Sequence, residues 1–246
     1  MRRILHPTPR PQRPRVPNGT RVYAIGDVHG RLDLLGEVFS RIDADLRTDA
    51  PPRAFQILLG DYVDRGPSSK KVIDLLISRG RTHEMHCLKG NHEALLLKFL
   101  EDPDTFAAWE KVGGVDTLNS YGLWPLLKEF PRNSSELASY FDLALPKSHR
   151  QFLAQLKTSF VCGDFFFAHA GVRPGIPLED QREQDLLWIR REFLTHQREF
   201  GKIIVHGHTP VLKPEIRTNR INIDTGAYAS GYLTCLRLDG CEISFI

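Results

Sequence analysis

The sequence predicts an α/β fold, in which short buried strands alternate with amphipathic helices. Short apolar runs recur along the chain, and most are followed by a segment whose apolar residues are spaced by three and four. Glycine-containing turns separate the two kinds of segment. The chain is 41% hydrophobic and 26% charged, and no apolar run approaches the ~18 residues of a membrane span. We therefore expect a folded chain and not a disordered or integral membrane protein.

The first half of the chain predicts three strand–helix units. The strands are expected at residues 21–25, 54–59 and 84–88, and the helices at 31–46, 68–79 and 93–100. The first helix has Leu32, Leu35 and Phe39 on one face. Gly80 follows the second helix and Pro103 lies just beyond the third, as is typical of helix C-termini.

Residues 104–157 predict a helical insertion within the same domain, with helical patterns near 134–142 and 147–157. Beyond the insertion, strands are expected at 160–162, 164–168 and 202–205, and a helix at 184–196. From residue 215 to the end, short apolar segments separated by turns predict strands of a mostly antiparallel second sheet.

The N-terminal arm, residues 1–20, is rich in proline and arginine and predicts a disordered, extended tail before a single domain at 21–246. A docking or nucleic-acid-binding arm and an arm that packs on the domain are the alternatives. The formal net charge is +3, but six arginines precede the first acidic residue, Asp27. The remaining 27 basic and 30 acidic residues give 22–246 a net charge of −3, so we expect neither a nucleic-acid nor a membrane partner. The arm lacks the apolar stretch of a secretory signal, and we expect a cytoplasmic protein.

Five of the expected strands run into turns that combine glycine with acid, amide or imidazole side chains. These turns read Gly-Asp-Val-His-Gly (26–30), Gly-Asp-Tyr-Val-Asp-Arg-Gly (60–66), Gly-Asn-His-Glu (90–93), His-Ala-Gly (169–171) and His-Gly-His-Thr-Pro (206–210). Ligands of open α/β sheets bind beyond the carboxyl ends of strands, so we expect the five turns to converge on one site.

The donor atoms in these turns are oxygen and nitrogen, without sulfur. The candidate donors are Asp27, His29, Asp61, Asn91, His169, His206 and His208. Carboxylate, amide and imidazole groups suit Mn²⁺, Fe or Zn²⁺, and their number exceeds the needs of one tetrahedral ion. Taken singly, Asn91 is also a common helix N-cap residue, and His169 is a common core residue. The joint pattern favours two metal ions about 3.5–4 Å apart that share a bridging carboxylate.

The motifs GDVHG, GDYVDRG, GNHE, HAG and GHTP resemble, in this order, the signature of the calcineurin-like metallophosphoesterases. GDYVDRG followed by GNHE is similar to the phosphoprotein phosphatase branch of that family. The chain length and the GHTPV and NIDTGA segments resemble its compact bacterial and phage serine/threonine phosphatases. The resemblance covers roughly residues 21–246. It implies a four-layer α/β/β/α sandwich of two mixed β-sheets flanked by helices.

The resemblance also implies a role for each matching residue. Asp27 and His29 match ligands of the first metal, Asp61 matches the bridging carboxylate, and Asn91, His169 and His208 match ligands of the second metal. Asp64, Arg65 and His92 match the acid–arginine–histidine set beside the metals, and Arg190 matches the second phosphate-binding arginine. His206 is the other histidine of its motif, and Arg191 is the neighbouring register for Arg190.

The implied activity is hydrolysis of phosphate monoesters. Its implied substrates are proteins or peptides that carry phosphoserine or phosphothreonine, with phosphotyrosine and small phosphate esters as further ones. Two divalent cations, expected to be Mn²⁺ with Fe or Zn²⁺ as alternatives, lower the pKa of a bridging water for direct attack on phosphorus. Arg65 and Arg190 supply forked donors for phosphoryl oxygens, and His92, held by Asp64, protonates the leaving alkoxide. The alternatives are a symmetrical dinucleoside-tetraphosphate hydrolase, a nuclease or broad phosphodiesterase, and a non-catalytic binding module.

Three other features are expected to be structural. Asp224-Thr225-Gly226 spells the triplet of aspartic proteases, but such enzymes need two copies and the chain has one. Gly113-Gly114 predicts a packing turn and not a phosphate loop. The three tryptophans, Trp109, Trp124 and Trp188, predict core packing, and Trp188 is the best candidate for lining a substrate groove.

Overall fold

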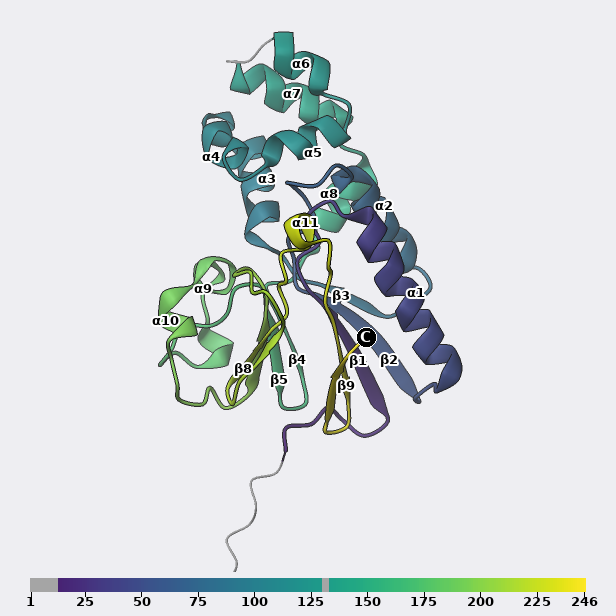
Figure 1. Ribbon diagram of the computed structural model, residues 1–246. Coiled ribbons are helices and arrows are strands. Elements are labelled where there is room, and N and C mark those ends of the chain that lie inside the picture. The colour runs from purple at the N-terminus through teal and green to yellow at the C-terminus, as the bar shows by residue number, and fades with distance from the viewer. Residues whose placement is uncertain (1–12, 130–132) are drawn as a thin grey trace, which may run out of the picture.

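The strands form two five-stranded sheets that lie face to face (Figure 1). The computed structural model describes residues 13–129 and 133–246. The first sheet contains β1 (Thr20–Ile25), β2 (Arg53–Leu58), β3 (Met85–Cys87), β9 (Cys235–Asp239) and β10 (Glu242–Phe245). The second contains β4 (Ser159–Cys162), β5 (Phe165–Ala168), β6 (Ile203–His206), β7 (Glu215–Ile216) and β8 (Arg220–Asn222). The strand orders are β10-β9-β1-β2-β3 and β4-β5-β6-β8-β7.

Both sheets are mixed. In the first, β1, β2 and β3 are parallel, and β9 runs antiparallel to β1 and β10. In the second, β5, β6 and β8 are parallel, and the edge strands β4 and β7 are antiparallel to their neighbours. The predicted pair of mixed sheets is confirmed. The expectation that the strands after residue 215 form a mostly antiparallel second sheet is wrong for β9 and β10, which extend the first sheet. The antiparallel pair β7 and β8 does join the second sheet, where β8 is parallel to β6.

Helices cover the outer face of each sheet. The helices are α1 (Leu32–Thr48), α2 (Ser69–Arg79), α3 (Asn91–Glu101), η1 (Pro103–Thr105), α4 (Phe106–Glu110), α5 (Gly114–Ser120), α6 (Trp124–Glu129), α7 (Ser134–Ala144), α8 (Lys147–Ala154), η2 (Leu178–Asp180), α9 (Glu183–Trp188), α10 (Arg191–Leu194) and α11 (Ala227–Ser230). In Figure 1, α1 and α2 flank the first sheet, α9 and α10 flank the second, and α4 to α7 stack beyond one end of the sheets. The predicted four-layer architecture is therefore confirmed.

The strands show the two-residue alternation of a sheet that is buried on both faces. In β1, Val22 and Ala24 belong to the core between the sheets, and Tyr23 and Ile25 belong to the core beneath the helices. Phe165 and Phe167 of β5 likewise face the first sheet. These alternating contacts hold the carboxyl ends of β1, β2, β5 and β6 in fixed register, which positions the turns that follow them.

The segment expected to form one helix over 184–196 forms two short helices instead. Helix α9 ends at Trp188, Ile189 has the extended ψ of 141°, and α10 begins at Arg191. Apolar spacing alone predicts a continuous helix here, but burial of Leu186, Ile189 and Phe193 against the second sheet requires the break. The break places Arg190 between the helices.

The end of the expected arm also differs from the prediction. Val16 is fully buried in the core between the sheets, and its N–H donates to the Gly240 carbonyl. The backbone N–H of Arg15 donates to the Asp164 carboxylate. Residues 15–19 therefore pack on the fold, because Val16 is buried in the core, and Arg15 and Gly19 make hydrogen bonds to Asp164 and Arg53. The arm prediction for 1–12 lies outside the described residues.

Within residues 13–129 and 133–246, none of the helices combines the length and the apolar character that crossing a membrane requires.

Candidate metal centre

The turns after the central strands of both sheets meet at one end of the fold. The first sheet contributes the turns after β1, β2 and β3, and the second contributes those after β5 and β6. Backbone hydrogen bonds join the first two turns, because the N–H groups of Val28 and His29 both donate to the Asp61 carbonyl. Across the sheets, the Gly207 N–H donates to the His169 carbonyl, and the His208 N–H donates to the Asp27 carboxylate. The predicted convergence of the five turns is what the structure shows.

The backbone of these turns is strained at the residues that carry the donors. Positive φ angles at non-glycine residues occur, in the described part of the chain, at His29 (45°), Asp61 (52°), Asp64 (71°), Arg65 (66°) and His208 (65°). Such angles cost a non-glycine residue of the order of 1 kcal/mol or more, and they cluster at functional sites. All five residues are among those expected from the sequence to form the site.

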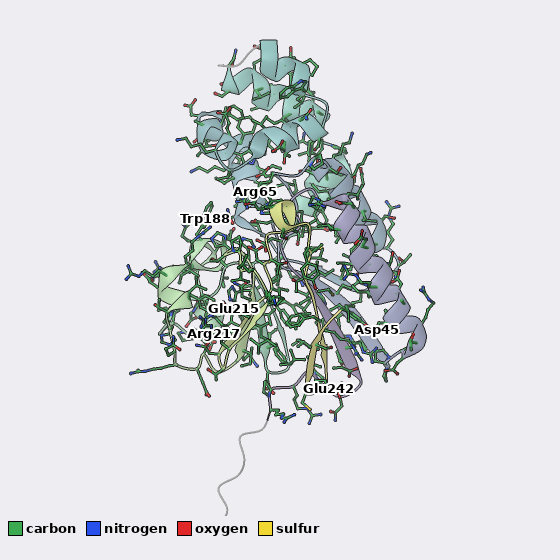
Figure 2. All side chains as sticks on the ribbon, in the orientation of Figure 1. Asp45, Arg65, Trp188, Glu215, Arg217 and Glu242 are labelled. Atoms are coloured by element: carbon green, nitrogen blue, oxygen red, sulfur yellow. The ribbon has the colours of Figure 1, made fainter. Side chains whose placement is uncertain are left out.

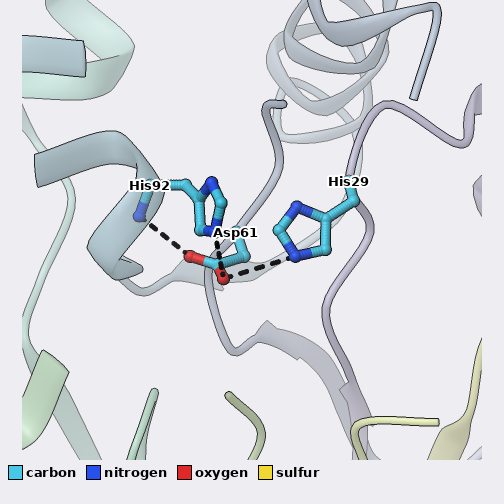
Figure 3. Close-up of side chains that lie close together, drawn as sticks. All are labelled: His29, Asp61 and His92. Carbon is cyan, nitrogen blue, oxygen red and sulfur yellow. Dashed lines mark hydrogen bonds and ion pairs between the residues drawn. The ribbon is translucent and has the colours of Figure 1, made fainter. Parts of the chain in front are cut away.

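The Asp61 carboxylate lies between the His29 and His92 side chains (Figure 3). Its Oδ2 is 3.5 Å from His29 Nε2 and 3.7 Å from His92 Nε2, and its Oδ1 is 3.4 Å from His169 Nε2. The backbone N–H of His92 also donates a hydrogen bond to Asp61 Oδ1 at 3.1 Å. Asn91 Oδ1 lies 2.9 Å from His169 Nε2 and 2.8 Å from His208 Nδ1. All these side chains are buried.

The donor atoms form two groups that share Asp61. One group is His29, Asp61 and His92, and the other is Asp61, His169 and His208, with the donor atoms of each within 4.8 Å of one another. Two buried groups with one common carboxylate are the arrangement of a dinuclear metal centre. Asp27 adjoins them through the His208 amide, and its other oxygen, Oδ1, is buried without a hydrogen-bond partner among the described residues.

Carbonyl groups orient two of the imidazoles. His29 Nδ1 lies 2.9 Å from the Val63 carbonyl, and His169 Nδ1 lies 3.0 Å from the Leu59 carbonyl. A carbonyl only accepts, so each Nδ1 carries the proton and each Nε2 presents a lone pair to the site. This tautomer is the one that a metal ligand of this orientation needs.

Burial and charge set the protonation states in the cluster. Burial lowers the pKa of His29 to about 3 and that of His208 to about 2, and it also lowers the pKa of His169. Burial opposes ionisation of Asp61, but the positive charge of neighbouring imidazoles, including His92 with its raised pKa, outweighs it and holds the pKa of Asp61 well below the ordinary value. Burial and the neighbouring Asp224 and Asp61 carboxylates raise the pKa of Asp27. Neutral imidazoles around a carboxylate are the forms that bind divalent metals.

A second buried pair lies beside the cluster. His92 Nδ1 is 2.6 Å from Asp64 Oδ2, and both side chains are inaccessible to solvent. Burial lowers the pKa of His92, but the carboxylates of Asp61 and Asp64 outweigh this effect, so the net shift is upward. Arg65 Nη2 lies 3.4 Å from His92 Nε2, and its guanidinium stacks on the Tyr228 ring with 4.6 Å from Cζ to the ring centroid.

Arg190 reaches the other side of the cluster from the break between α9 and α10. Its Nε lies 3.0 Å from His208 Nε2. The neighbouring Arg191 is exposed and is the first residue of α10. Figure 2 shows Arg65 and Trp188 at the end of the sheets that faces the helical segment. The Trp188 ring lies 6.4 Å from the His208 ring, edge to face.

His206 and Asp224 lie near the centre without belonging to either donor group. The His206 ring packs edge-on against Phe193 in the outer layer, and burial lowers its pKa to about 3. The Asp224 carboxylate accepts the Gly226 N–H of its own turn, and burial raises its pKa to about 6.

Sequence patterns did not reveal two residues that contact this site. Trp109 of α4 and Thr117 of α5 both donate hydrogen bonds to the Asp64 carboxylate. They lie more than forty residues from Asp64 in the chain, so no local spacing relates them to the GDYVDRG motif. The only sequence signal was the Gly113-Gly114 pair between them.

Comparison with known proteins extends these observations. The family model described as "Calcineurin-like phosphoesterase" matches residues 20–235. The chain is 27% identical to the bis(5'-nucleosyl)-tetraphosphatase PrpE [asymmetrical] of Anoxybacillus flavithermus, over 89% of this chain and 90% of that protein. It is 28% identical to serine/threonine-protein phosphatase 2 of Escherichia coli, over 88% of this chain and 92% of that protein.

Solved structures share the fold. The crystal structure of a protein proposed to be a diadenosine tetraphosphatase has a TM-score of 0.65 and 20% sequence identity, and the match covers 92% of each chain. A mutant of a cold-active protein tyrosine phosphatase has a TM-score of 0.60 at 14% identity, covering 93% of this chain and 80% of that one.

Proposed function

The chain belongs to the calcineurin-like phosphoesterase family, and from this premise we propose that it hydrolyses phosphate monoesters at a dinuclear metal centre, with phosphoserine and phosphothreonine residues of proteins as substrates. The observation that carries the monoester proposal is the 2.6 Å contact between His92 and Asp64 beside the donor cluster.

The residues of the cluster fit a pair of divalent cations. Asp27 Oδ1 is buried without a partner, which is costly unless a cation or another donor satisfies it. Oxygen and nitrogen donors suit Mn²⁺, with Fe and Zn²⁺ as alternatives. The first ion would be held by Asp27, His29 and Asp61, and the second by Asp61, Asn91, His169 and His208. When bound, the two ions supply positive charge for the phosphoryl group and a water of lowered pKa as the nucleophile.

Two arginines bind the phosphoryl oxygens in this proposal. Arg65 and Arg190 stand on opposite sides of the cluster, next to His92 and His208. Their planar forks can donate two parallel hydrogen bonds to an oxyanion. Among the described residues, Arg65 contacts the Val112 carbonyl and His92 Nε2, and Arg190 contacts His208 Nε2.

His92 serves as the acid for the leaving group. Asp64 accepts a hydrogen bond from His92 Nδ1–H, so that Nε2 points to the cluster, 3.7 Å from Asp61 Oδ2. A serine or threonine alkoxide is a poor leaving group and needs a proton as the P–O bond breaks. Nucleotide leaving groups are far more acidic and need this proton less, so the pair favours monoesters of alcohols.

The test is a direct comparison of substrates. We expect kcat/KM of the Mn²⁺-supplemented protein to be higher for a phosphothreonine peptide than for diadenosine tetraphosphate. A preference for the dinucleotide of more than about tenfold, equivalent to ~1.4 kcal/mol in transition-state stabilisation, would overturn the protein phosphatase proposal.

A dinucleoside tetraphosphate is the second candidate substrate. Several relatives bear the name of asymmetrical bis(5'-nucleosyl)-tetraphosphatases, whereas the alternative considered from the sequence was a symmetrical dinucleoside-tetraphosphate hydrolase. Two aromatic rings flank the cluster: Tyr228 lies 5.5 Å from the His29 ring, and Trp188 lies beside His208 on the other side. Such rings suit two bases, because every base has a face that stacks on an aromatic ring.

Two variants separate the candidates. If a dinucleotide is the substrate, Trp188→Ala should raise KM for diadenosine tetraphosphate at least about tenfold and leave KM for a phosphothreonine peptide within about twofold. Tyr228→Ala also removes the ring on which Arg65 stacks, so it should raise both KM values, and the KM for the dinucleotide by more. ATP plus AMP as products would indicate asymmetrical cleavage, and two ADP symmetrical cleavage. Equal effects on both substrates would remove the argument from the two rings.

A further inference from the structure

The Asp64 carboxylate is fully buried and uses both oxygens for hydrogen bonds. Oδ2 accepts from Trp109 Nε1 at 2.9 Å and lies 2.6 Å from His92 Nδ1. Oδ1 accepts from the Thr117 hydroxyl at 2.6 Å. Trp109 and Thr117 belong to the helical segment beyond α3, whereas Asp64 follows β2. Donors from a different part of the chain therefore fix the plane of this carboxylate.

Thr117 holds the backbone of Asp64 as well as its side chain. The Asp64 N–H donates to Thr117 Oγ1 at 2.8 Å, so one hydroxyl accepts from the backbone and donates to the carboxylate of the same residue. Asp64 has a φ of 71°, which a non-glycine residue adopts only when surrounding contacts impose it. The hydroxyl is one of those contacts.

The turn between the two donors touches Arg65. The Arg65 N–H donates to the Gly113 carbonyl at 3.3 Å. A Cβ at Gly113 would lie 2.8 Å from the Arg65 nitrogen, and a Cβ at Gly114 would lie 2.5 Å from the Trp109 ring. Neither position has room for a side chain, so the glycine pair permits the close approach of this turn to Asp64 and Arg65.

We propose that Trp109 and Thr117 are positioning residues that orient the Asp64–His92 pair for proton donation to the leaving group. The inference rests on the proposed function of His92 as the acid. The geometry of an acid–base pair must be held closely for efficient proton transfer, and the residues that support its members determine that geometry. In this fold the support comes from the helical segment that carries α4 and α5.

Core packing alone is the competing explanation for Trp109. Its ring is fully buried and packs 5.1 Å from the Phe99 ring and 5.9 Å from the Phe141 ring. Packing accounts for the ring but not for the direction of its N–H, and it does not account for the Thr117 hydroxyl. Variants that remove a donor and keep the shape separate the two explanations.

The variants are Thr117→Val and Trp109→Phe, made in the full chain. Thr117→Val replaces the hydroxyl with a methyl group of similar size, and Trp109→Phe keeps an aromatic ring without the N–H. Thr117→Ser keeps the hydroxyl, and Phe99→Leu disturbs the same aromatic cluster without touching Asp64. Each is assayed on a phosphoserine peptide, whose leaving group is poor, and on p-nitrophenyl phosphate, whose leaving group is good. Thermal unfolding and bound metal per chain are measured in parallel.

We expect Thr117→Val and Trp109→Phe to lower kcat on the phosphoserine peptide at least about tenfold, with KM and metal content retained and a loss on p-nitrophenyl phosphate below about threefold. Thr117→Ser should restore most of the kcat on the peptide. Phe99→Leu should lower the melting temperature and affect both substrates alike. Should Trp109→Phe fail to fold, Thr117→Val and its serine counterpart decide the matter.

His92→Ala separates failure of this inference from failure of the proposed function. If His92→Ala shows the dependence on leaving group and the two donor variants do not, Trp109 and Thr117 have no positioning role, and the proposed acid stands. If His92→Ala itself loses equal activity on both substrates, His92 is not the acid, and the proposed function and the inference built on it both fall.

Discussion

The Glu93 carboxylate accepts a hydrogen bond from the backbone N–H of Asp61 at 2.9 Å. The same carboxylate accepts from the N–H groups of Tyr62 at 2.7 Å, Val63 at 3.2 Å and Gly90 at 2.9 Å. One buried side chain of α3 therefore holds the backbone of the turn after β2 and of the turn after β3. The central carboxylate of the candidate metal site depends on this contact for its position.

Replacing Glu93 with glutamine should destabilise the fold and disorder the Asp61 turn. Glutamine has an NH2 group in place of one carboxylate oxygen, and this group faces backbone N–H donors. At least one backbone N–H therefore loses its acceptor, at a cost of about 1–3 kcal/mol. Chemical denaturation measures the free energy of unfolding. Glu101→Gln, an exposed change on the same helix, is the control and should be neutral. Equal stability of Glu93→Gln and the wild type would contradict the role assigned to this carboxylate.

Asp61 and Asp27 should differ in their effect on metal content. Asp61 belongs to both donor groups, so Asp61→Asn should lower bound metal at both positions, whereas Asp27→Asn should chiefly weaken one. Elemental analysis after equilibration with limiting Mn²⁺ gives the stoichiometry. Retention of two metals per chain in Asp61→Asn would rule out the bridging assignment.

Val16 should contribute to stability although it precedes the first strand. Its side chain is fully buried between the sheets, and truncation to alanine removes two methyl groups and leaves a cavity. We expect Val16→Ala to lower the free energy of unfolding by about 1–3 kcal/mol. Val161→Ala is the matched control, because that valine is 50% exposed. A deletion of residues 1–12 leaves the Val16 contacts in place and should be tolerated better than a deletion of 1–19.

His86 should make the protein less stable in acid. Burial, followed by the charge of Lys157, lowers the pKa of His86 in the folded chain, and its ring stacks on Phe160 at 3.9 Å. In the unfolded chain this histidine takes up a proton below about pH 6.5, whereas the folded chain resists protonation, so stability falls as the pH drops through this range. The phenylalanine ring in the His86→Phe variant has no group that takes up a proton in this pH range. The difference in unfolding free energy between pH 7 and pH 5.5 should therefore be smaller in the variant than in the wild type, and an unchanged difference would exclude His86 as a source of it.

The donor turns could be read from the sequence because each is a local motif at the end of an apolar strand. Asp27, His29, Asp61 and Asn91 were expected to converge, since carboxyl ends of parallel strands share one edge of a sheet. The break that exposes Arg190 was not expected, because residues 184–196 have continuous helical spacing and tertiary contacts of Ile189 override it.

Long-range contacts account for the other differences. Val16 could not be assigned to the core from a stretch of prolines and arginines. Its contacts are with residues far away in the chain: its N–H donates to the Gly240 carbonyl, and its side chain packs in the core between the two sheets. Trp109 was expected in the core and is there, but the direction of its N–H depends on Asp64, forty-five residues away. Sequence periodicity reports which face of an element is buried and carries no information on such single hydrogen bonds.

The candidate metal donors come from both sheets, so bound metal should affect the order in which parts of the molecule unfold. Asp27, His29, Asp61 and Asn91 follow strands of the first sheet, whereas His169 and His208 follow strands of the second. Ions held as proposed would cross-link the two sheets at one end, whereas the apolar core between the sheets holds them together elsewhere. Chelation should then let this end open first, with faster amide exchange in the turns after β5 and β6 than in the middle of the strands. Loss of metal would thus separate the two sheets locally, at the end that carries the donors, before either sheet unfolds.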